Sequence, residues 1–451
     1  MEEGKAGKAC LFTDGFFKKQ WMAISEGLRK VSESSDSASL RSHLQAISSD
    51  ANFHATRAGK ADFEAVLDYI PESKDFFSRI LPKIVRLAEA AFSFESKDVK
   101  LLVQGVADVV FLTYPEVATI LALAFLGLLP NGASMSPLYF PKDGCAFPPN
   151  TEKLRCFLSY FDQISETACD EQGIRVSRIV RSEQLTLKDL ETSACRLCKM
   201  RLHDLRQPIY ESKAPLHVDF ANASVGGGIF LNAPGATAQE EITFATHPEL
   251  CIATILCDAL KDNEAVLIHG ARHFCRHVGF LDTFAFLENV PPDDPDFFSD
   301  AMQVVIDARM YDGGGIGRPY RYDHKFQVDD CQRDLQKAFY GFAGAVASVA
   351  PKMGNQKIPA ATGNWGCGAF GGSSAVKVFL QWIAASLAGL EALEYFPWDD
   401  LLLHQFLTDS EEVFSEATVG QLCRALRQAA HLQTQLETDV KRYEDDGAEF
   451  L

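Results

Sequence analysis

Short apolar runs separated by helical segments fill the chain after residue 170, and they restrict the possible folds more than any other feature. The runs are RVSRIV, PLHVDFA, AVLIHG, QVVIDA and ALEYF. Runs of this length, bounded by turn residues, are typical of buried strands. The segments 248–260 and 374–390, which lie between them, have helical periodicity. Strands that alternate with helices predict an α/β fold, a layered sheet with helices on both faces.

The part before residue 150 is predicted to be helical. Apolar residues recur at helical spacing from Phe63 to Leu129. The apolar run 117–129 is too short to cross a bilayer as a helix, so we expect a buried helix there. Residues up to about Phe53 are rich in serine, alanine and charged residues, which predicts a mobile lead or a loosely packed helix.

These patterns divide the chain into two parts. We expect a helical accessory region with a mobile lead over 1–150 and an α/β domain over 151–451. The second part begins with a helix over 151–164 and contains an amphipathic helix within 418–440. A chain of 451 residues is long enough for both.

Composition limits the partners and the compartment. The formal net charge of −18 repels nucleic acid and anionic membranes at long range, so we expect neither as a direct partner. A phosphate-bearing ligand would need local donors in a cleft. The twelve cysteines have no repeating spacing, and the first residues lack the apolar core of a signal peptide. Both features indicate an intracellular protein with reduced thiols.

The stretch VGGGIFLNAPGATAQEE, 225–241, raises the first chemical hypothesis. Its glycines follow a predicted strand, where bare backbone can approach a ligand and offer free N–H groups to phosphate oxygens. Glu240 and Glu241 open the next predicted helix, and one of them could act as general acid or base. Helical neighbours point about 100° apart and would do different jobs. The alternative is a surface turn before a solvated helix start.

A second glycine-rich stretch, ATGNWGCGAFGG at 361–372, also leads into a predicted helix. Five glycines surround its polar and aromatic residues. The N-terminus of a helix holds anions through backbone donors. Two such loops suit a ligand that carries two phosphates.

Together these motifs resemble poly(ADP-ribose) glycohydrolases. VDFAN, GGG and QEE occur in that order, and GNWGCGAFGG follows, within a likeness that runs from about Phe76 to Tyr395. The resemblance implies a macrodomain, a mixed sheet between helices with a helical accessory region before it. It also implies hydrolysis of the ribose–ribose O-glycosidic bonds of poly(ADP-ribose), which releases ADP-ribose without a cofactor.

The resemblance assigns roles to single residues. Glu241 would be the catalytic acid/base, and Glu240 beside it would bind ribose hydroxyls. Asp219 and Asn222, at the end of the VDFAN strand, would position the ribose. The other expected substrate contacts are Gly226, Gly227 and Gly228 at the pyrophosphate, Gln239 in the signature, and Asn364, Gly366 and Phe370 at the diphosphate and distal ribose.

Adenine recognition follows the family less closely. The expected aromatic surfaces for the base are Trp398, which follows Pro397, and Phe274. His277 would add a weaker, pH-sensitive edge to the pocket. Tyr210 stands where the family has a glutamate that binds adenine. Ten residues separate GGG from QEE, a longer loop than is usual in the family.

Three further features have simpler explanations. Two clusters have metal-binding residue types, namely Cys195 with Cys198 and His203, and His269 with His273 and His277. The first lacks a second pair and the second is expected in a loop, so we expect no metal. The glycine run within 311–324 is predicted to be a surface insertion.

Two other functions stay open beside hydrolysis of the polymer. One is a macrodomain that binds ADP-ribose without cleaving it, although a binder has no need for both glutamates. The other is an enzyme acting on mono-ADP-ribosylated protein. We expect poly(ADP-ribose) and ADP-ribosylated proteins as partners, a monomeric state, and a nuclear or cytoplasmic location.

Overall fold

The structure is a computed structural model. It describes residues 10–12, 16, 20–50, 75–135, 148–164, 171–231, 233, 235–298, 301–311, 328–353, 356–414 and 416–429. The chain forms two compact units. The first unit is Met1–Arg178, Ala221–Ala259 and Ile268–Asp300, and the second is Ile179–Phe220, Leu260–Leu267 and Ala301–Leu451.

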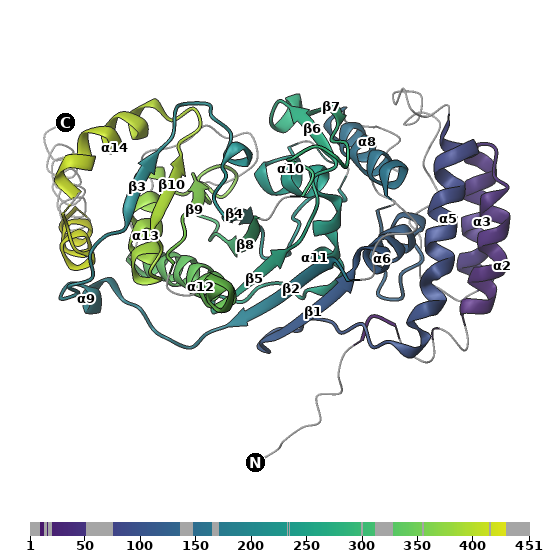
Figure 1. Cartoon of the computed structure of the whole chain (residues 1–451), viewed down its shortest axis with the longest axis horizontal. Coiled ribbons are helices and arrows are strands. Elements are labelled where there is room, and N and C mark those ends of the chain that lie inside the picture. Colours follow the sequence, from purple (N-terminus) through teal and green to yellow (C-terminus); the bar gives the residue numbers. More distant parts are fainter. Residues whose placement is uncertain are drawn as a thin grey trace, which may run out of the picture. The chain divides into compact units, whose positions relative to one another are not determined.

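An eight-stranded mixed sheet is the central element of the topology (Figure 1). In spatial order its strands are β1 (Asp108–Thr113), β2 (Gly173–Val180), β5 (Glu264–His269), β8 (Met302–Asp307), β4 (Leu216–Ala221), β9 (Ala360–Gly363), β10 (Ala392–Phe396) and β3 (Lys199–Leu202). β1 pairs with β2 antiparallel, whereas β10 pairs with both β9 and β3 in parallel. The five predicted runs are β2, β4, β5, β8 and β10, so this part of the prediction is confirmed.

The first unit is mainly helical. Its helices are α2 (Trp21–Ser32), α3 (Ser37–Asp50), η3 (Phe76–Ile80), α5 (Leu81–Glu89), η4 (Ala90–Ser96), α6 (Tyr114–Leu126), α8 (Pro148–Gln163), α10 (Gln239–Thr246), η6 (Pro248–Leu250), α11 (Cys251–Leu256) and η7 (Leu281–Thr283). It also contains a two-stranded antiparallel sheet, β6 (Cys275–Val278) with β7 (Ala285–Asn289). β6 lies in the histidine segment that was expected to be a loop.

Two predictions for the N-terminal half need correction. The region expected to be helical throughout contains β1, a strand of alternating burial directly before α6. The lead, expected to be mobile or a loosely packed helix, contains α2 and α3, which pack on each other, with α2 also on α5 (Figure 1). Ile24, Leu28 and Val31 at helical spacing are fully buried, so this segment is an amphipathic packed helix.

Helix α6 confirms the predicted buried apolar helix. Thr113 and Glu116 form a capping box at its start, and Gly127, at φ +70°, ends it. Every residue from Val117 to Leu126 is buried. No helix within the described ranges is both long and apolar enough to cross a membrane.

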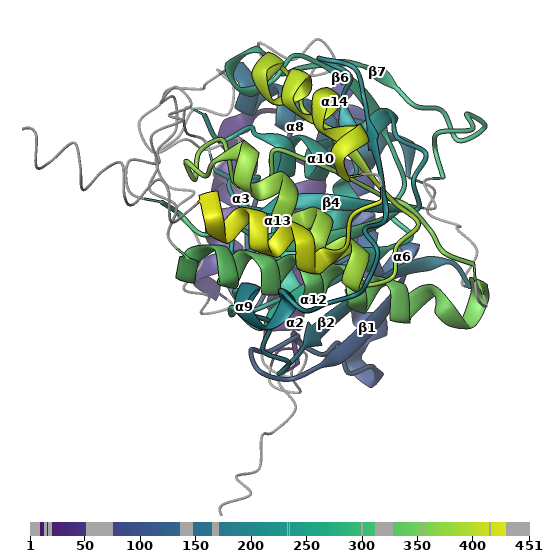
Figure 2. The same cartoon turned by 90° about the vertical axis from the view of Figure 1, so that its left-hand side faces the viewer.

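The second unit is built on the helices α12 (Val328–Met353) and α13 (Ser374–Leu387), which pack side by side (Figure 2). α12 also packs on β8, where a Cβ at Gly341 would lie 2.7 Å from Ile306. The absence of a side chain at Gly341 therefore lets this helix approach the sheet closely. The described part of the unit also contains α9 (Leu187–Leu190), η5 (Ile209–Glu211) and α14 (Leu401–Phe414). The helix predicted near the C-terminus is present from Val419, and its part after residue 429 lies outside the described residues.

Candidate active site

The QEE motif forms the first turn of α10, and both of its glutamates are buried. Glu240 is 3% exposed and Glu241 is 8% exposed. The residue before the helix, Ala238, is extended, and its N–H donates to Oε2 of Glu241 across 2.9 Å. This bond is the backward half of a capping box, which fixes the Glu241 carboxylate over the helix N-terminus.

The glycine turn holds both carboxylates through its backbone. Glu240 accepts the N–H of Asn222 at 2.9 Å and the N–H of Gly226 at 2.6 Å. Oε1 of Glu241 accepts the N–H of Gly228 at 2.7 Å. Each carboxylate therefore accepts two backbone N–H bonds, and the two side chains converge on one turn rather than pointing to separate places.

Gly227 lies between the two carboxylates. A Cβ at this position would lie 2.5 Å from Oε2 of Glu240 and 2.5 Å from Oε1 of Glu241. Its φ of +51° is also in the left-handed region, which favours glycine. A side chain would therefore collide with the acids themselves, not only with a ligand.

The structure corrects the expectation that the N–H groups of this run are free for phosphate. Those of Gly226 and Gly228 bind the glutamates, and that of Gly227 donates to the carbonyl of Ser224 at 3.0 Å. The turn is thus organised first as a clamp for carboxylates. Its lack of side chains still permits the close approach of a ligand.

Sequence reasoning missed a lysine beneath the turn. Lys153 of α8 is fully buried, and its Nζ donates to the carbonyls of Gly228, Leu231 and Ala236 at 3.1, 3.1 and 2.7 Å. Burial lowers the pKa of Lys153 to about 7, against the opposing charge of Glu241. No motif marks this lysine, because it lies in an amphipathic helix about 75 residues earlier in the chain.

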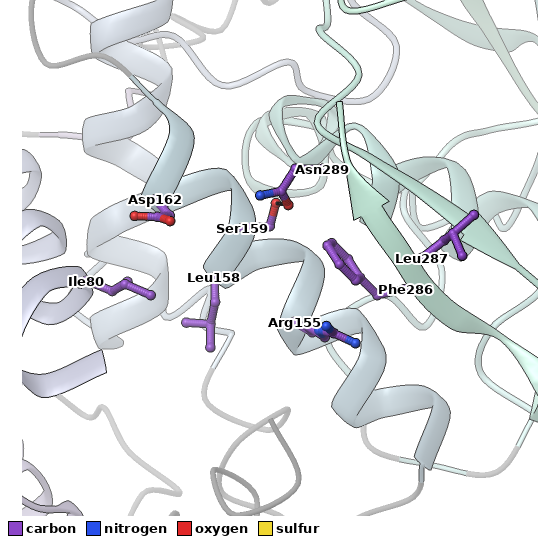
Figure 3. A pocket seen from close by; sticks show the side chains of 8 residues that line it. All are labelled: Ile80, Arg155, Leu158, Ser159, Asp162, Phe286, Leu287 and Asn289. Atoms are coloured by element: carbon purple, nitrogen blue, oxygen red, sulfur yellow. Dashed lines mark hydrogen bonds between the residues drawn. The ribbon is translucent and has the colours of Figure 1, made fainter. Parts of the chain in front are cut away.

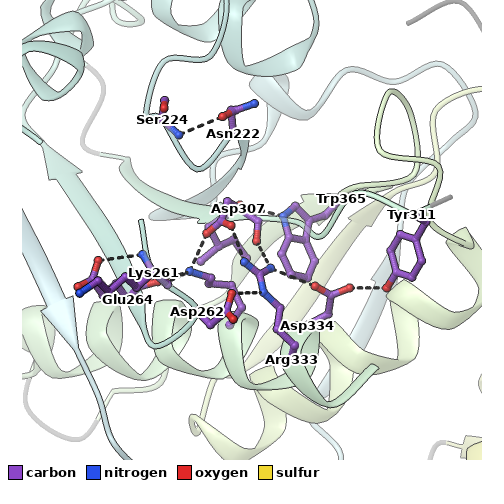
Figure 4. Close-up of polar contacts among 12 residues, drawn as sticks. Asn222, Ser224, Lys261, Asp262, Glu264, Asp307, Tyr311, Arg333, Asp334 and Trp365 are labelled. Atoms are coloured by element: carbon purple, nitrogen blue, oxygen red, sulfur yellow. Dashed lines mark hydrogen bonds and ion pairs between the residues drawn. The ribbon is translucent and has the colours of Figure 1, made fainter. Parts of the chain in front are cut away.

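Two other predicted substrate contacts near the glutamates, Asn222 and Gln239, are more exposed than the glutamates. Asn222 is exposed, and its Oδ1 accepts the N–H of Ser224 at 3.0 Å (Figure 4). Gln239 is partly buried at the first position of α10. Both lie in the first unit with Glu240 and Glu241.

Two expected adenine contacts of the first unit need correction. Phe274 is fully buried, with edge contacts to Tyr160 and Phe297 at 4.8 and 5.2 Å between ring centroids. Its ring is therefore part of the core and offers no face to a base. Burial, reinforced by the neighbouring His273, lowers the pKa of His277 to about 4. His277 is therefore neutral near pH 7 and not the pH-sensitive edge that was expected.

The other predicted site residues lie in the second unit. Asp219 is fully buried in β4. The Nδ2 of Asn364 donates to the carbonyl of Pro397 at 2.9 Å, and its Oδ1 accepts the hydroxyl of Tyr395 at 2.8 Å. Asn364 thus joins the second glycine loop to β10 and to the residue that follows it. Gly366, at φ +71°, turns this loop.

Phe370 is held in the same loop through its backbone. Its side chain is partly buried, and its carbonyl accepts the N–H of Tyr311 at 2.9 Å.

A buried charge network supports the second loop from below (Figure 4). Lys377 forms an ion pair with Asp334, and its Nζ lies 4.2 Å from the ring centroid of Trp365. Burial acts to raise the pKa of Asp334, but the charge and hydrogen bond of Lys377 hold it below its ordinary value. Asp334 also accepts the Tyr311 hydroxyl at 2.7 Å. Arg333 bonds Asp307 and Asp334, which extends the network to β8.

Trp398 has the most strained backbone among the predicted site residues. It follows Pro397 after β10 and has φ +55°, which is rare for a bulky residue. The side chain is 40% exposed, and the carbonyl accepts the N–H of Arg206 at 2.9 Å. A strained residue that presents an exposed indole is typical of a ligand contact.

A cavity, the possible metal clusters and a further glycine run are the remaining candidates for a functional site. A cavity of about 260 Å³ in the first unit is lined by Ile80, Arg155, Leu158, Ser159, Asp162, Phe286, Leu287 and Asn289, none of which was predicted for the site (Figure 3). In the described part of the chain, no three His, Cys, Asp or Glu residues are placed to hold a metal ion. The glycine run predicted to be a surface insertion falls within 312–327, which lies outside the described residues.

The molecule combines a mixed sheet and its helices, a helical region before them, and a carboxylate pair clamped by a glycine turn. Together these features define a macrodomain-type protein. Comparison with known families supports this class. Residues 187–405 match the macro domain fold of poly(ADP-ribose) glycohydrolase, and residues 70–178 match the helical domain of the same family. The chain belongs to the poly(ADP-ribose) glycohydrolase family.

Several individual proteins are similar to this chain. The chain is 26% identical over 420 residues to a probable poly(ADP-ribose) glycohydrolase 2 of Arabidopsis thaliana, covering 79% of this chain and 78% of the relative. It is 28% identical over 356 residues to poly(ADP-ribose) glycohydrolase 2 of Caenorhabditis elegans, covering 76% and 69%. A crystal structure of poly(ADP-ribose) glycohydrolase from Deinococcus radiodurans with ADP-ribose matches 54% of this chain and 92% of its own, at 14% identity and a TM-score of 0.29.

Proposed function

We propose that this chain hydrolyses the ribose–ribose O-glycosidic bonds of poly(ADP-ribose) and releases ADP-ribose, with Glu241 as general acid and base. The observation that carries the proposal is the clamped pair of buried glutamates on the glycine turn. Family membership supports the substrate class, and the geometry supports the choice of residues. No cofactor takes part in the proposed reaction.

The proton transfers follow from the position of Glu241. Both of its oxygens accept one N–H bond, and each keeps a second lone pair that can carry or receive a proton. Protonated Glu241 gives its proton to the leaving ribose oxygen while the anomeric C–O bond breaks through an oxocarbenium-like state. Water then forms the new C–O bond and returns a proton to the Glu241 carboxylate.

Glu240 has a different task in this scheme. Its two backbone bonds fix it beside Glu241, where it can accept hydrogen bonds from the ribose hydroxyls. We assign Asn222 and Gln239 to the same ribose, and Gly226, Gly227 and Gly228 to the close approach of the pyrophosphate. Because their N–H groups are occupied, the glycines would contribute space rather than donors.

The second unit would contribute the remaining contacts. We propose Asn364, Gly366 and Phe370 for the diphosphate and distal ribose, and Trp398 for adenine. Asp219 is buried, so we propose that it supports the end of β4 rather than touching the sugar. We also keep, as a proposal, the division into an accessory region over 1–150 and a catalytic domain over 151–451.

One experiment tests this function against its two rivals. The purified protein is incubated in parallel with poly(ADP-ribose) and with mono-ADP-ribosylated protein, and free ADP-ribose is measured by chromatography. Release from the polymer supports the proposal. Binding of the polymer without release favours a non-catalytic reader, and release from the mono-ADP-ribosylated protein alone favours the other hydrolase.

A further inference from the structure

We propose that Lys153 is a positioning residue for this reaction, which fixes the loop between the glycine run and QEE and, through Gly228, the carboxylate of Glu241. The inference rests on the proposed function, since it concerns the same carboxylate. Lys153 itself touches neither substrate nor the reacting atoms in this scheme.

The three acceptors of Lys153 are distributed along the loop. Gly228 lies at its start, Leu231 follows, and Ala236 precedes α10. An ammonium group has three N–H donors, and here each has a carbonyl partner. The side chain therefore closes a ten-residue connection at both ends with one cation.

A second residue of α8 supports the same loop. Nδ2 of Asn150, three residues before Lys153 and thus on the same face of the helix, donates to the carbonyl of Ala233 at 3.3 Å. Side chains on one face of α8 therefore donate the hydrogen bonds that these four loop carbonyls would otherwise receive from backbone N–H groups in a helix or a sheet.

Gly228 connects Lys153 to the chemistry. Its carbonyl accepts from Lys153 at 3.1 Å, and its N–H donates to Oε1 of Glu241 at 2.7 Å. A shift of this one residue would therefore move the carboxylate oxygen. Misplacement of a catalytic group by about 1 Å can cost two orders of magnitude in rate.

The choice of lysine indicates more than packing. Burial of an ammonium is costly, and a methionine of similar length would fill the space without that cost. The lysine is fully buried nonetheless, with all its donors directed at one loop. Its use is therefore explained by the geometry it imposes on that loop.

The test separates positioning from mere support of the fold. Lys153→Met keeps the length of the stem and removes all three donors. We expect kcat on poly(ADP-ribose) to fall at least about tenfold, while the Kd for ADP-ribose changes less than about threefold and melting stays cooperative. A merely structural lysine would lower the folded fraction and leave kcat per folded molecule unchanged, which would overturn the proposal.

A matched control and a second variant complete the design. Lys83→Met removes a lysine of α5 in the same unit. Its Nζ donates to the carbonyl of Asp162 at 2.8 Å, and Asp162 lies at the other end of α8 from Lys153. We expect normal kcat from it. If Lys153→Met does not fold, Lys153→Gln, which keeps two N–H donors, replaces it and should give an intermediate kcat; wild-type kcat in this variant contradicts the role.

Wild type and Glu241→Gln are measured alongside. An inactive wild type would contradict the proposed function. An active wild type with an equally active Lys153→Met would contradict only the role of Lys153. Equal losses in kcat and in ADP-ribose affinity would place Lys153 in substrate binding and overturn its assignment to Glu241.

Discussion

The backbone N–H of Gly228 donates to Oε1 of Glu241 across 2.7 Å. The three glycines and the two glutamates, which are separated by eleven residues in sequence, therefore form one unit in space. Glycine is needed at position 227 because the two acids occupy the volume in which a side chain would lie. The turn is a preorganised holder for carboxylates, and preorganised charge is the largest contribution in many enzymes.

Substitution of Gly227 tests this arrangement. Gly227→Ala places a Cβ 2.5 Å from one oxygen of each glutamate, so the carboxylates must move. We expect at least about a hundredfold loss of kcat per folded molecule. Gly389→Ala is the matched control, because Gly389 has φ +81° but nothing within 4 Å of its Cβ. It should lose about 1 kcal/mol of stability and keep its activity. Equal activity of the two variants would show that the clash is harmless.

Trp398→Ala tests the adenine surface. Stacking on an indole is worth about 1–3 kcal/mol, so we expect calorimetry to show at least a fivefold weaker affinity for ADP-ribose. Affinity for ribose 5-phosphate, which lacks the base, should not change. Phe298→Ala removes an aromatic ring that is 52% exposed in the first unit and serves as the control. If both ligands weaken equally, Trp398 is not the adenine platform.

The sequence predicted the strands that contain apolar runs bounded by turn residues, and it missed those that depend on their neighbours in the sheet. β9, with the sequence AATG, is a strand because it lies between β4 and β10. β3 lies at the edge of the sheet with no buried position, so it has no apolar pattern. β1 is buried on one side only, and its run of apolar residues directly before a helix resembled a further helical turn.

In the candidate site, too, some features could be predicted from the sequence and others depend on the packing of neighbours. The positions of Glu240 and Glu241 at a helix start were predictable, because QEE follows a glycine turn. The convergence of the two carboxylates on that turn could not be predicted. Helical periodicity gives the directions in which the two side chains leave the helix, but it does not give the path of the glycine turn that they meet. Phe274 was assigned to adenine from a motif, yet only the packing of Tyr160 and Phe297 reveals that its ring is enclosed.

Asp334→Asn tests the support of the second glycine loop. The change leaves the buried ammonium of Lys377 without its charged partner, and we expect a loss of about 3–5 kcal/mol in the free energy of unfolding. Asp262→Asn removes a carboxylate that is 81% exposed and pairs with Arg333, which should cost less than about 1 kcal/mol. Chemical denaturation measures both. Similar losses in the two variants would argue against a supporting role for the buried pair.

The low pKa of His277 predicts a pH-dependent stability. Its folded pKa of about 4 lies below its ordinary value of 6.5, so the unfolded chain binds the proton more tightly. The folded chain therefore keeps its full free energy of unfolding above pH 6.5, and it loses part of this stability as the pH falls towards 4. Between pH 7 and pH 5 the difference in unfolding free energy between wild type and His277→Gln should shrink by about 2 kcal/mol. A difference that stays constant over this range would mean that His277 titrates normally.

The most direct test of the account is the rate of ADP-ribose release from poly(ADP-ribose) by Glu241→Gln. The amide keeps the size of the side chain and removes the group that transfers the proton. The account predicts a fall in kcat of at least about a hundredfold relative to wild type, with cooperative melting and ADP-ribose affinity preserved. Turnover close to that of wild type would contradict the assignment of Glu241 as the acid and base.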